Sequence, residues 1–341
     1  MAVSEERYSD KRMSEDFTAY VLFSEPLEGT FGEIIAAAAE DYAGLDWDHQ
    51  ALGPDRINTR GVTLCVDFGS ESPTRGSVKM IGVPGPCDVS WDDTYLKNRL
   101  VFPHAKDVVG RHTDHLSISV SSARGDGSAE TLFARRFDAV RKLTCLVAVL
   151  AKLPITTAVY FPNGDTLLPP SVWEKAAEDA MKGEIPLLGW INFVVNAFDE
   201  PPEPLPITVS TIGLAAFNGH EIIMPRMRML WPKAMEFAHV TTRMLIEGDH
   251  TFADSNTLGH EAGKPEFRIR HAAEGRQLRF PDGIHRPQTD QWWLFHETCD
   301  LDDIDIFGPR TGKPPPPGYD NSIHGDMDRL KKSLYRFHAG S

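Results

Sequence analysis

The chain has 341 residues, of which 41% are hydrophobic and 25% are charged, as is typical of a globular protein that buries a core. These values exclude a mostly disordered chain, a collagen-like fibre and a disulfide-knot scaffold. Lysine and arginine number 35 against 49 aspartates and glutamates, so the formal net charge is -14. Because so acidic a chain repels phosphate groups, its charge disfavours nucleic-acid and membrane partners and is compatible with a basic protein partner.

The four cysteines are scattered, without the Cys-x-x-Cys spacing of a zinc ribbon or a redox motif. Cys65 and Cys145 sit within apolar runs, which predicts buried free thiols. The polar amino terminus lacks the apolar stretch of a signal peptide, and no window approaches the roughly 18 apolar residues of a membrane span. We therefore expect a reduced, cytoplasmic protein, and the sequence predicts no cofactor.

The first half of the chain predicts strands and helices after a polar, flexible segment at residues 1–16. Residues 17–23 form an apolar run typical of a buried strand, and Thr30 with Glu33 has the spacing of a helix capping box. Further strands are predicted at residues 62–68, 77–83 and 115–120, followed by a long helix at 128–153. In the strand at 115–120, Leu116, Ile118 and Val120 should face the core. In the long helix, Arg135, Arg136, Arg141 and Lys142 lie off the apolar stripe.

The second half repeats this order in outline. The pattern predicts strands at residues 155–161, 186–197, 207–216 and 221–224, the last two joined by a hairpin turn at Asn218-Gly219. Helices are predicted from Pro169-Pro170 to Gly183 and at 233–247, and short strands near 267–269 and 277–280. Because strands cluster beside a few helices, the sequence favours an α+β fold with largely antiparallel sheets.

The weak similarity of the two halves predicts a pair of ferredoxin-like units that share one core. The expected boundaries are a first α+β half at residues 17–153, a second at 154–299, and an acidic, proline-rich extension at 300–341. The four consecutive prolines at 314–317 favour an extended conformation, and a short amphipathic helix is expected at 328–337.

The densest cluster of titratable residues lies between His104 and His115. On a helix, His112 and His115 would share one face at metal-binding distance, and His104 or Asp114 could complete the ligand set. The segment runs directly into a predicted strand, however, where residues three apart point to opposite faces. The alternative is that His115 begins the strand and His112 ties down the preceding loop by hydrogen bonds.

No other motif of established chemistry occurs in the sequence, which lacks a Gly-x-Ser-x-Gly elbow, a phosphate-binding loop and the His-Glu-x-x-His pattern of zinc peptidases. The acidic run at residues 300–305 lacks the glycine and glutamate of a calcium loop. Trp173, Trp190, Trp231 and the pair Trp292-Trp293 supply large apolar area. We expect most of it in the core, and any exposed part to be an anchor for a partner.

Several stretches together resemble one bacterial family, the domain-of-unknown-function family DUF4261, over about residues 17–259. They are Val83-Pro84-Gly85-Pro86, His112-x-x-His115-Leu-Ser-Ile-Ser-Val, Ala158-Val159-Tyr160-Phe161, the run 211–217 that leads to His220-Glu221-Ile222, and the segment 252–259. The resemblance implies an α+β fold and draws attention to His112 and His115. It transfers no activity, because none is established for the family.

Taken together, these features predict a cytoplasmic, non-enzymatic protein-binding or regulatory module, such as an immunity or accessory protein in bacterial competition. Acidic inhibitors of this kind mask basic sites on their targets. The alternative is a metal-dependent hydrolase that uses His112, His115 and a nearby acid.

Overall fold

The structure of the protein is a computed structural model, and it describes residues 16–43, 63–68, 76–87, 89, 102, 104–122, 129–197, 206–247, 252, 257–258, 267–272, 278–280, 283–285 and 290–296 of the chain. The chain folds into two compact units. The first ends at Asn192, and the second contains the chain from Phe193 onward. None of the helices in the described ranges is both long and apolar enough to cross a membrane. The features predicted for residues 1–15 and 300–341 lie outside the described residues.

The first unit is built on a six-stranded sheet in the order β2-β3-β4-β1-β5-β6. Its neighbouring strands pair antiparallel throughout. The strands are β1 (Asp16–Phe23), β2 (Thr63–Phe68), β3 (Gly76–Pro84), β4 (Asp114–Ser122), β5 (Thr156–Phe161) and β6 (Thr166–Leu168). Because β5 and β6 complete this sheet, the first unit extends to Asn192 instead of ending at residue 153.

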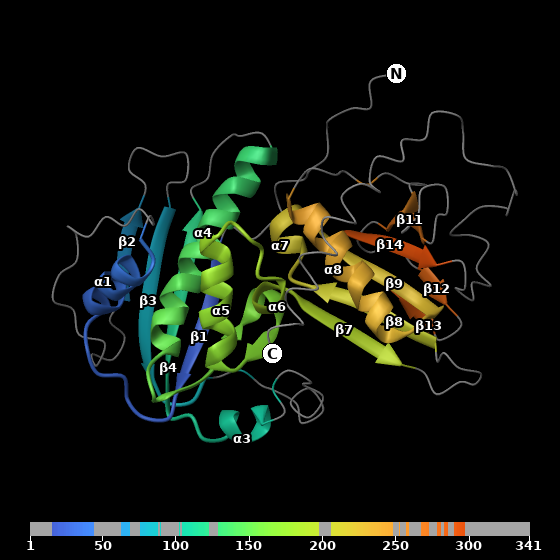
Figure 1. The fold of residues 1–341 in the computed structure, drawn as a ribbon. Helices are drawn as coiled ribbons and strands as arrows, with labels where there is room; N and C mark the ends of the chain where they lie inside the picture. Colours follow the sequence, from blue (N-terminus) through green and yellow to red (C-terminus); the bar gives the residue numbers. More distant parts are fainter. Residues whose placement is uncertain are drawn as a thin grey trace, which may run out of the picture. The chain divides into compact units, whose positions relative to one another are not determined.

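Three helices lie on one face of this sheet (Figure 1), and the core lies beneath them. They are α1 (Phe31–Asp41), α4 (Ala129–Ala151) and α5 (Pro170–Met181). Leu116, Ile118 and Val120 are fully buried, as the alternation in β4 predicted. The capping box of α1 is confirmed, because Glu33 N donates to Thr30 Oγ1 at 3.2 Å and Thr30 N donates to Glu33 Oε2 at 2.7 Å.

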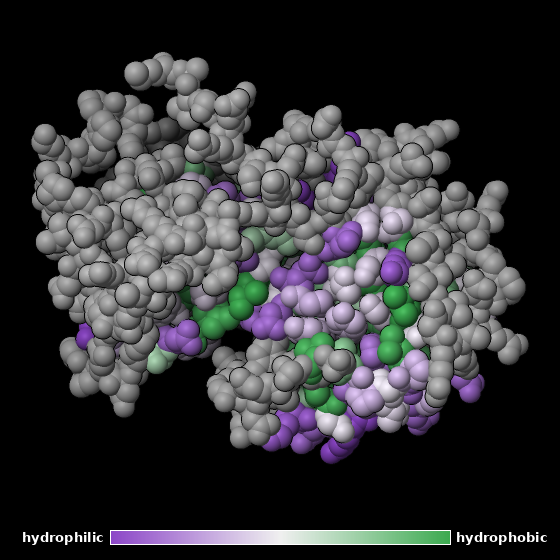
Figure 2. All heavy atoms as spheres, turned by 180° about the vertical axis from the view of Figure 1, so that it is seen from behind, coloured by the Kyte–Doolittle hydropathy of each residue, from purple (hydrophilic) through white to green (hydrophobic). Residues whose placement is uncertain are grey.

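The other face of the sheet changes from apolar to hydroxyl-rich along the strands. At one end the short helix α3 (Ala105–Val109) joins an apolar cluster that includes Leu22, Ala158 and Tyr160. Farther along, Thr18 lies opposite Ser119, and their hydroxyl oxygens are 2.9 Å apart. Figure 2 views the protein from the back, and many of the coloured atoms there are pale purple or white. Such a surface is typical of the solvated face of an antiparallel sheet.

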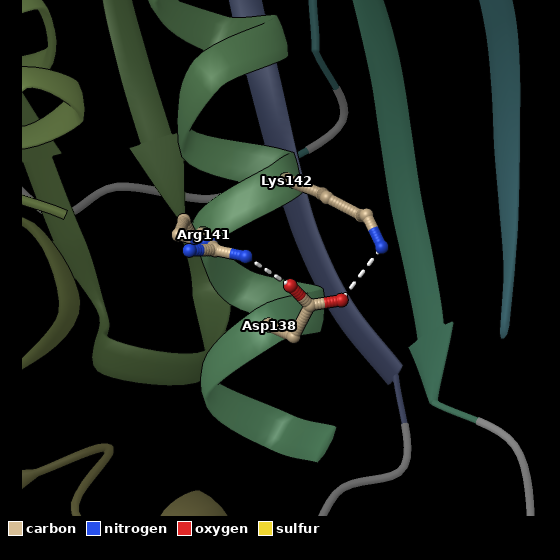
Figure 3. A network of polar contacts seen from close by, with 3 residues as sticks. All are labelled: Asp138, Arg141 and Lys142. Atoms are coloured by element: carbon tan, nitrogen blue, oxygen red, sulfur yellow. Dashed lines mark hydrogen bonds and ion pairs between the residues drawn. The ribbon is translucent and has the colours of Figure 1, made fainter. Parts of the chain in front are cut away.

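The helix α4 carries an ion network that the sequence pattern did not predict (Figure 3). Asp138 accepts hydrogen bonds from Arg141 Nη2 at 2.5 Å and from Lys142 Nζ at 2.6 Å. Lys142 is 1% exposed and Arg136 is 6% exposed, so placing both outside the buried face of this helix was wrong. A lysine can be buried in this way because a carboxylate one turn away on the same helix compensates its charge.

A tight turn after β5 ties three parts of the first unit together. The Asn163 amide donates from Nδ2 to Asp16 O and accepts from Thr18 N, so it substitutes for a neighbouring strand along β1. Gly164 lies against the carbonyl group of Trp190, at the end of the short helix α6 (Leu187–Trp190). Asp165 adopts a left-handed conformation with φ of 46° and accepts a hydrogen bond from Tyr160 Oη at 3.0 Å.

The second unit contains a sheet in the order β10-β11-β14-β9-β8-β7, in which β14 and β9 run parallel and the other recorded pairs are antiparallel. Its strands are β7 (Asn192–Ala197), β8 (Pro206–Ile212), β9 (His220–Arg228), β10 (Thr257–Leu258), β11 (Phe267–Ala272) and β14 (Asp290–His296), and a separate hairpin pairs β12 (Leu278–Phe280) with β13 (Gly283–His285). The helices are α7 (Ala215–Asn218) and α8 (Trp231–Glu247). With both units, the predicted α+β class with largely antiparallel sheets is confirmed.

Two strands predicted in this region are shorter than expected. The stretch 186–197 forms α6 before it enters β7, and the stretch 207–216 leaves β8 at Ile212 and continues into α7. The Asn218-Gly219 pair therefore ends a helix instead of forming a two-residue hairpin turn, and Gly219 has the left-handed φ of 83° that such an end favours.

Candidate functional site

His112 lies between α3 and β4 and uses both of its ring nitrogens to bond the main chain. Nδ1 donates to Val109 O at 2.5 Å, and Nε2 accepts from Cys87 N at 2.7 Å. This pair of bonds requires the proton on Nδ1 and the lone pair on Nε2, which is a neutral imidazole. A metal ion at Nε2 would have to displace the Cys87 amide from the same lone pair.

His115 and Asp114 hold the same turn from the first residues of β4. His115 Nδ1 donates to Gly85 O at 3.1 Å, and Asp114 Oδ1 accepts from Gly85 N at 3.3 Å. Burial lowers the pKa of the His115 imidazole, an effect that the bond to Gly85 opposes. Together, His112, Asp114 and His115 clamp the turn at 85–87, in which Gly85 has a φ of 104°.

His104 stands apart from this arrangement. It is exposed, precedes α3 as its N-cap residue, and makes no capping hydrogen bond through its side chain. Within the described ranges, no three His, Cys, Asp or Glu side chains form a group that could hold a metal ion. The structure thus brings His112, Asp114 and His115 to one turn, while the assignment of metal ligands stays a prediction.

The described cysteines are buried free thiols. Cys145 is fully buried and Cys87 is 8% exposed, so the prediction for Cys145 is confirmed, whereas the Cys65 side chain lies outside the described residues. Burial raises the pKa of the Cys145 thiol to about 12, although the charge of the nearby Arg141 lowers it. Cys145 therefore stays protonated near neutral pH, and a protonated thiol is a poor nucleophile.

Glu221 is a carboxyl group that sequence reasoning did not single out. It lies in β9, and its side chain accepts hydrogen bonds from Thr211 Oγ1 at 2.6 Å, Gly213 N at 2.8 Å and Ala215 N at 3.1 Å. Burial raises the pKa of this carboxyl to about 7, against the lowering effect of these hydrogen bonds. Glu221 thus fixes the bend between β8 and α7 and titrates near neutral pH.

The raised pKa of Glu221 predicts a pH-dependent stability. The folded protein retains the Glu221 proton up to about pH 7, while the unfolded chain releases it near the ordinary value of 4.5. Between these values the folded state binds more protons, so the free energy of unfolding should fall as pH rises, by about 3 kcal/mol in total. Urea unfolding between pH 5 and 8 measures this loss.

Two variants separate Glu221 from other titrating groups. Glu221→Gln removes the proton equilibrium while an amide oxygen can still accept from the main chain, so its stability should lose this part of the pH dependence. Thr211→Val removes a hydrogen bond that lowers the pKa, so the midpoint of the loss should move to higher pH. An unchanged pH profile in Glu221→Gln would show that the slope has another source.

The most exposed large apolar residues in the described ranges are Leu230 and Trp231, at 69% and 58%. They stand at the start of α8, which buries Ala234 and Phe237 farther along the helix. The main chain is fixed at this point, because Leu230 O accepts from Lys233 N at 3.0 Å and from Ala234 N at 3.2 Å. By contrast, Trp173 and Trp190 are fully buried, so the expectation that most of the tryptophan area lies in the core is confirmed for these two.

Leu230 and Trp231 form what we call the α8 anchor. A tryptophan with an aliphatic neighbour on a rigid helix start offers a large contact area whose ordering costs little side-chain entropy. Comparison with known proteins adds no assignment, since no protein-family model, curated protein or solved structure matches the chain.

Proposed function

We propose that this chain is a cytoplasmic, non-enzymatic protein-binding module that engages a basic partner through the α8 anchor. The observation that carries the proposal is the exposure of Leu230 and Trp231 on an ordered helix start. Tryptophan is among the residues most enriched in binding hot spots, where it fills a pocket on the partner. Exposed apolar residues of this size in a contiguous pair are typical of interaction surfaces.

The charge of the chain determines the kind of partner. A net charge of -14 steers a basic protein toward the surface and repels acidic ones, which favours fast and selective association. The buried free thiols of Cys87 and Cys145 accord with a reducing compartment. An immunity or accessory role in bacterial competition, where an acidic protein masks a basic site, fits these properties.

Two finer expectations belong to this proposal. The first is membership in the DUF4261 family, on the motifs that surround His112, His115 and Glu221. The second is that the two units are related ferredoxin-like halves, since each combines a mostly antiparallel sheet with packed helices. A determined structure of any member of that family, superposed on each unit separately, would test both expectations.

The α8 anchor predicts a large loss of affinity on truncation. With the basic partner isolated from the native cell by the full-length protein, Trp231→Ala should weaken binding by about 30-fold or more, because a hot-spot residue contributes about 2 kcal/mol or more. Isothermal titration calorimetry measures the change. Ile212→Ala is the control, since Ile212 is also apolar and is 37% exposed.

The same titration tests the charge of the partner. Affinity for a basic partner should fall as salt is added, because ions screen the attraction between opposite charges. Equal affinities of Trp231→Ala and the wild-type protein would contradict the α8 anchor. An affinity that rises with salt would contradict the basic partner.

A further inference from the structure

The strand β7 is the outermost strand on one side of the sheet in the second unit, as Figure 1 shows. Its neighbour on the inner side is β8, and no described strand lies on its outer side. Val195, Asn196 and Ala197 are all exposed. An edge strand of this kind presents a row of main-chain N–H and C=O groups that can pair with another strand.

The sequence of β7 lacks the features that usually prevent such pairing. Asn-Phe-Val-Val-Asn-Ala contains no charged residue and no proline, which are the usual devices that protect a free edge. The opposite edge of the same sheet, β10, has only two residues, and the edge strand β6 of the first unit has three. The edge strand β2 of the first unit has six residues, as β7 has, but it contains the charged Asp67. Among these edges, β7 alone is both uncharged and long enough for a ladder of several hydrogen bonds.

We propose that β7 pairs with β7 of a second copy of this chain, antiparallel about a two-fold axis, so that the two sheets become one continuous sheet. A two-fold axis perpendicular to the sheet keeps the two faces of each copy on the same sides. Phe193 packs on His239 of α8, with ring centroids 4.3 Å apart, so the α8 helices of both copies lie on one face of the joined sheet.

Residues that lie opposite each other in a sheet must point to the same face. The two-fold axis of this pair must therefore be centred on one residue of β7 and not between two residues. Centred on Val194, the strand places Val194 opposite its own copy, Phe193 opposite Val195, and Asn192 opposite Asn196. Each opposition is favourable, since aromatic and β-branched residues pair well across strands and two amides can exchange hydrogen bonds. The strand is therefore complementary to itself.

Charge distinguishes a second copy from the basic partner of the proposed function. An uncharged strand offers nothing that would select a basic protein. Two copies with a net charge of -14 each repel one another, and salt screens this repulsion. Dimerisation should therefore strengthen with salt, whereas binding of a basic partner should weaken. Failure of one proposal thus leaves the other intact.

The experiment is sedimentation equilibrium of the full-length chain at low and high salt. We expect a reversible monomer–dimer equilibrium that shifts toward dimer with protein concentration and with salt. Val195→Lys should lower the association constant by about tenfold, because it replaces both Phe193–Val195 pairs and adds charge to the edge. Ile212→Lys is the matched control, since Ile212 has the same 37% exposure as Val195 but lies on β8.

A cysteine at the axis tests the register. In Val194→Cys the two introduced thiols would face each other, so mild oxidation should give a disulfide-linked dimer that neither the wild-type chain nor Ile212→Cys forms. Circular dichroism confirms that each variant is folded. A chain that stays monomeric at all concentrations and salts overturns the proposal, and so does a dimer that Val195→Lys leaves unchanged or that Ile212→Lys weakens equally.

Discussion

Replacing Asp138 with alanine should lower the free energy of unfolding by about 3–5 kcal/mol, because it removes the carboxylate that compensates the charge of the buried Lys142. Lys142 is 1% exposed, and its amino group lies 2.6 Å from Asp138 Oδ2. Arg141 bonds the other oxygen of the same carboxylate (Figure 3). The single substitution thus removes a carboxylate that two cations share, and the core around α4 keeps the Lys142 ammonium from water. Urea unfolding of the full-length protein, followed by circular dichroism, measures the loss.

An exposed ion pair with the same geometry provides the control. Lys152 Nζ lies 2.6 Å from Asp41 Oδ2, but the side chains are 45% and 39% exposed. Because water solvates both charges after the pair is broken, Asp41→Ala should cost about 1 kcal/mol or less. Equal losses in Asp41→Ala and Asp138→Ala would contradict the role assigned to burial.

A double variant tests whether the charges or the volume matter. Asp138→Leu combined with Lys142→Met replaces the buried pair with apolar side chains. Its stability should exceed that of Asp138→Ala, since no lysine then remains buried without its carboxylate. A double variant as unstable as the single one would show that packing, and not charge compensation, controls this site.

The elements predicted correctly are those whose signals are local in the sequence. The alternation of Leu116, Ile118 and Val120 with serines sets the two faces of β4, and the spacing of Thr30 and Glu33 sets the start of α1. Both patterns act within a few residues, so the sequence alone contains enough information to predict them.

The features that the sequence pattern missed depend on contacts between distant residues. Residues 187–190 turn into a helix where Trp190 reaches Thr144 of α4, with Nε1 donating to Oγ1 at 2.9 Å. The strand β8 ends where Glu221 takes up the amides of Gly213 and Ala215. Lys142 is buried because it pairs with Asp138, and the apolar spacing of the helix does not reveal that pairing.

The same contrast between local signals and contacts of distant residues applies to the candidate site. Sequence spacing drew attention to His112 and His115 and left two readings open, and the observed bonds to Cys87 and Gly85 are those of residues that hold a loop. The sequence predicts that most tryptophans lie in the core and that an exposed one would be an anchor, and only the fold shows that Trp231 is exposed. Glu221 lies in a stretch of the family resemblance, but no spacing predicts its role, because the groups that bond it come from the preceding strand and helix.

Among the described glycines of the first unit, Gly164 should tolerate an added methyl group least, because in Gly164→Ala the new atom would meet rigid main chain. A Cβ at Gly164 would lie 2.3 Å from Trp190 O and 3.0 Å from the carbonyl carbon of the same residue. A side chain could rotate away, whereas this carbonyl is held by the turn of α6 and by the buried indole of Trp190. We expect a loss of about 3 kcal/mol or more, at the upper end of overpacking effects.

Gly189→Ala is the matched control for this substitution, in the helix that Gly164 contacts. There the nearest atom to an added Cβ is the Ala176 methyl at 3.7 Å, which is an ordinary van der Waals contact. Alanine also stabilises a helix more than glycine does. Gly189→Ala should therefore be neutral or stabilise by up to about 1 kcal/mol, measured by the same urea titration. If Gly164→Ala were equally mild, the Trp190 carbonyl would not be held as rigidly as the surrounding contacts indicate.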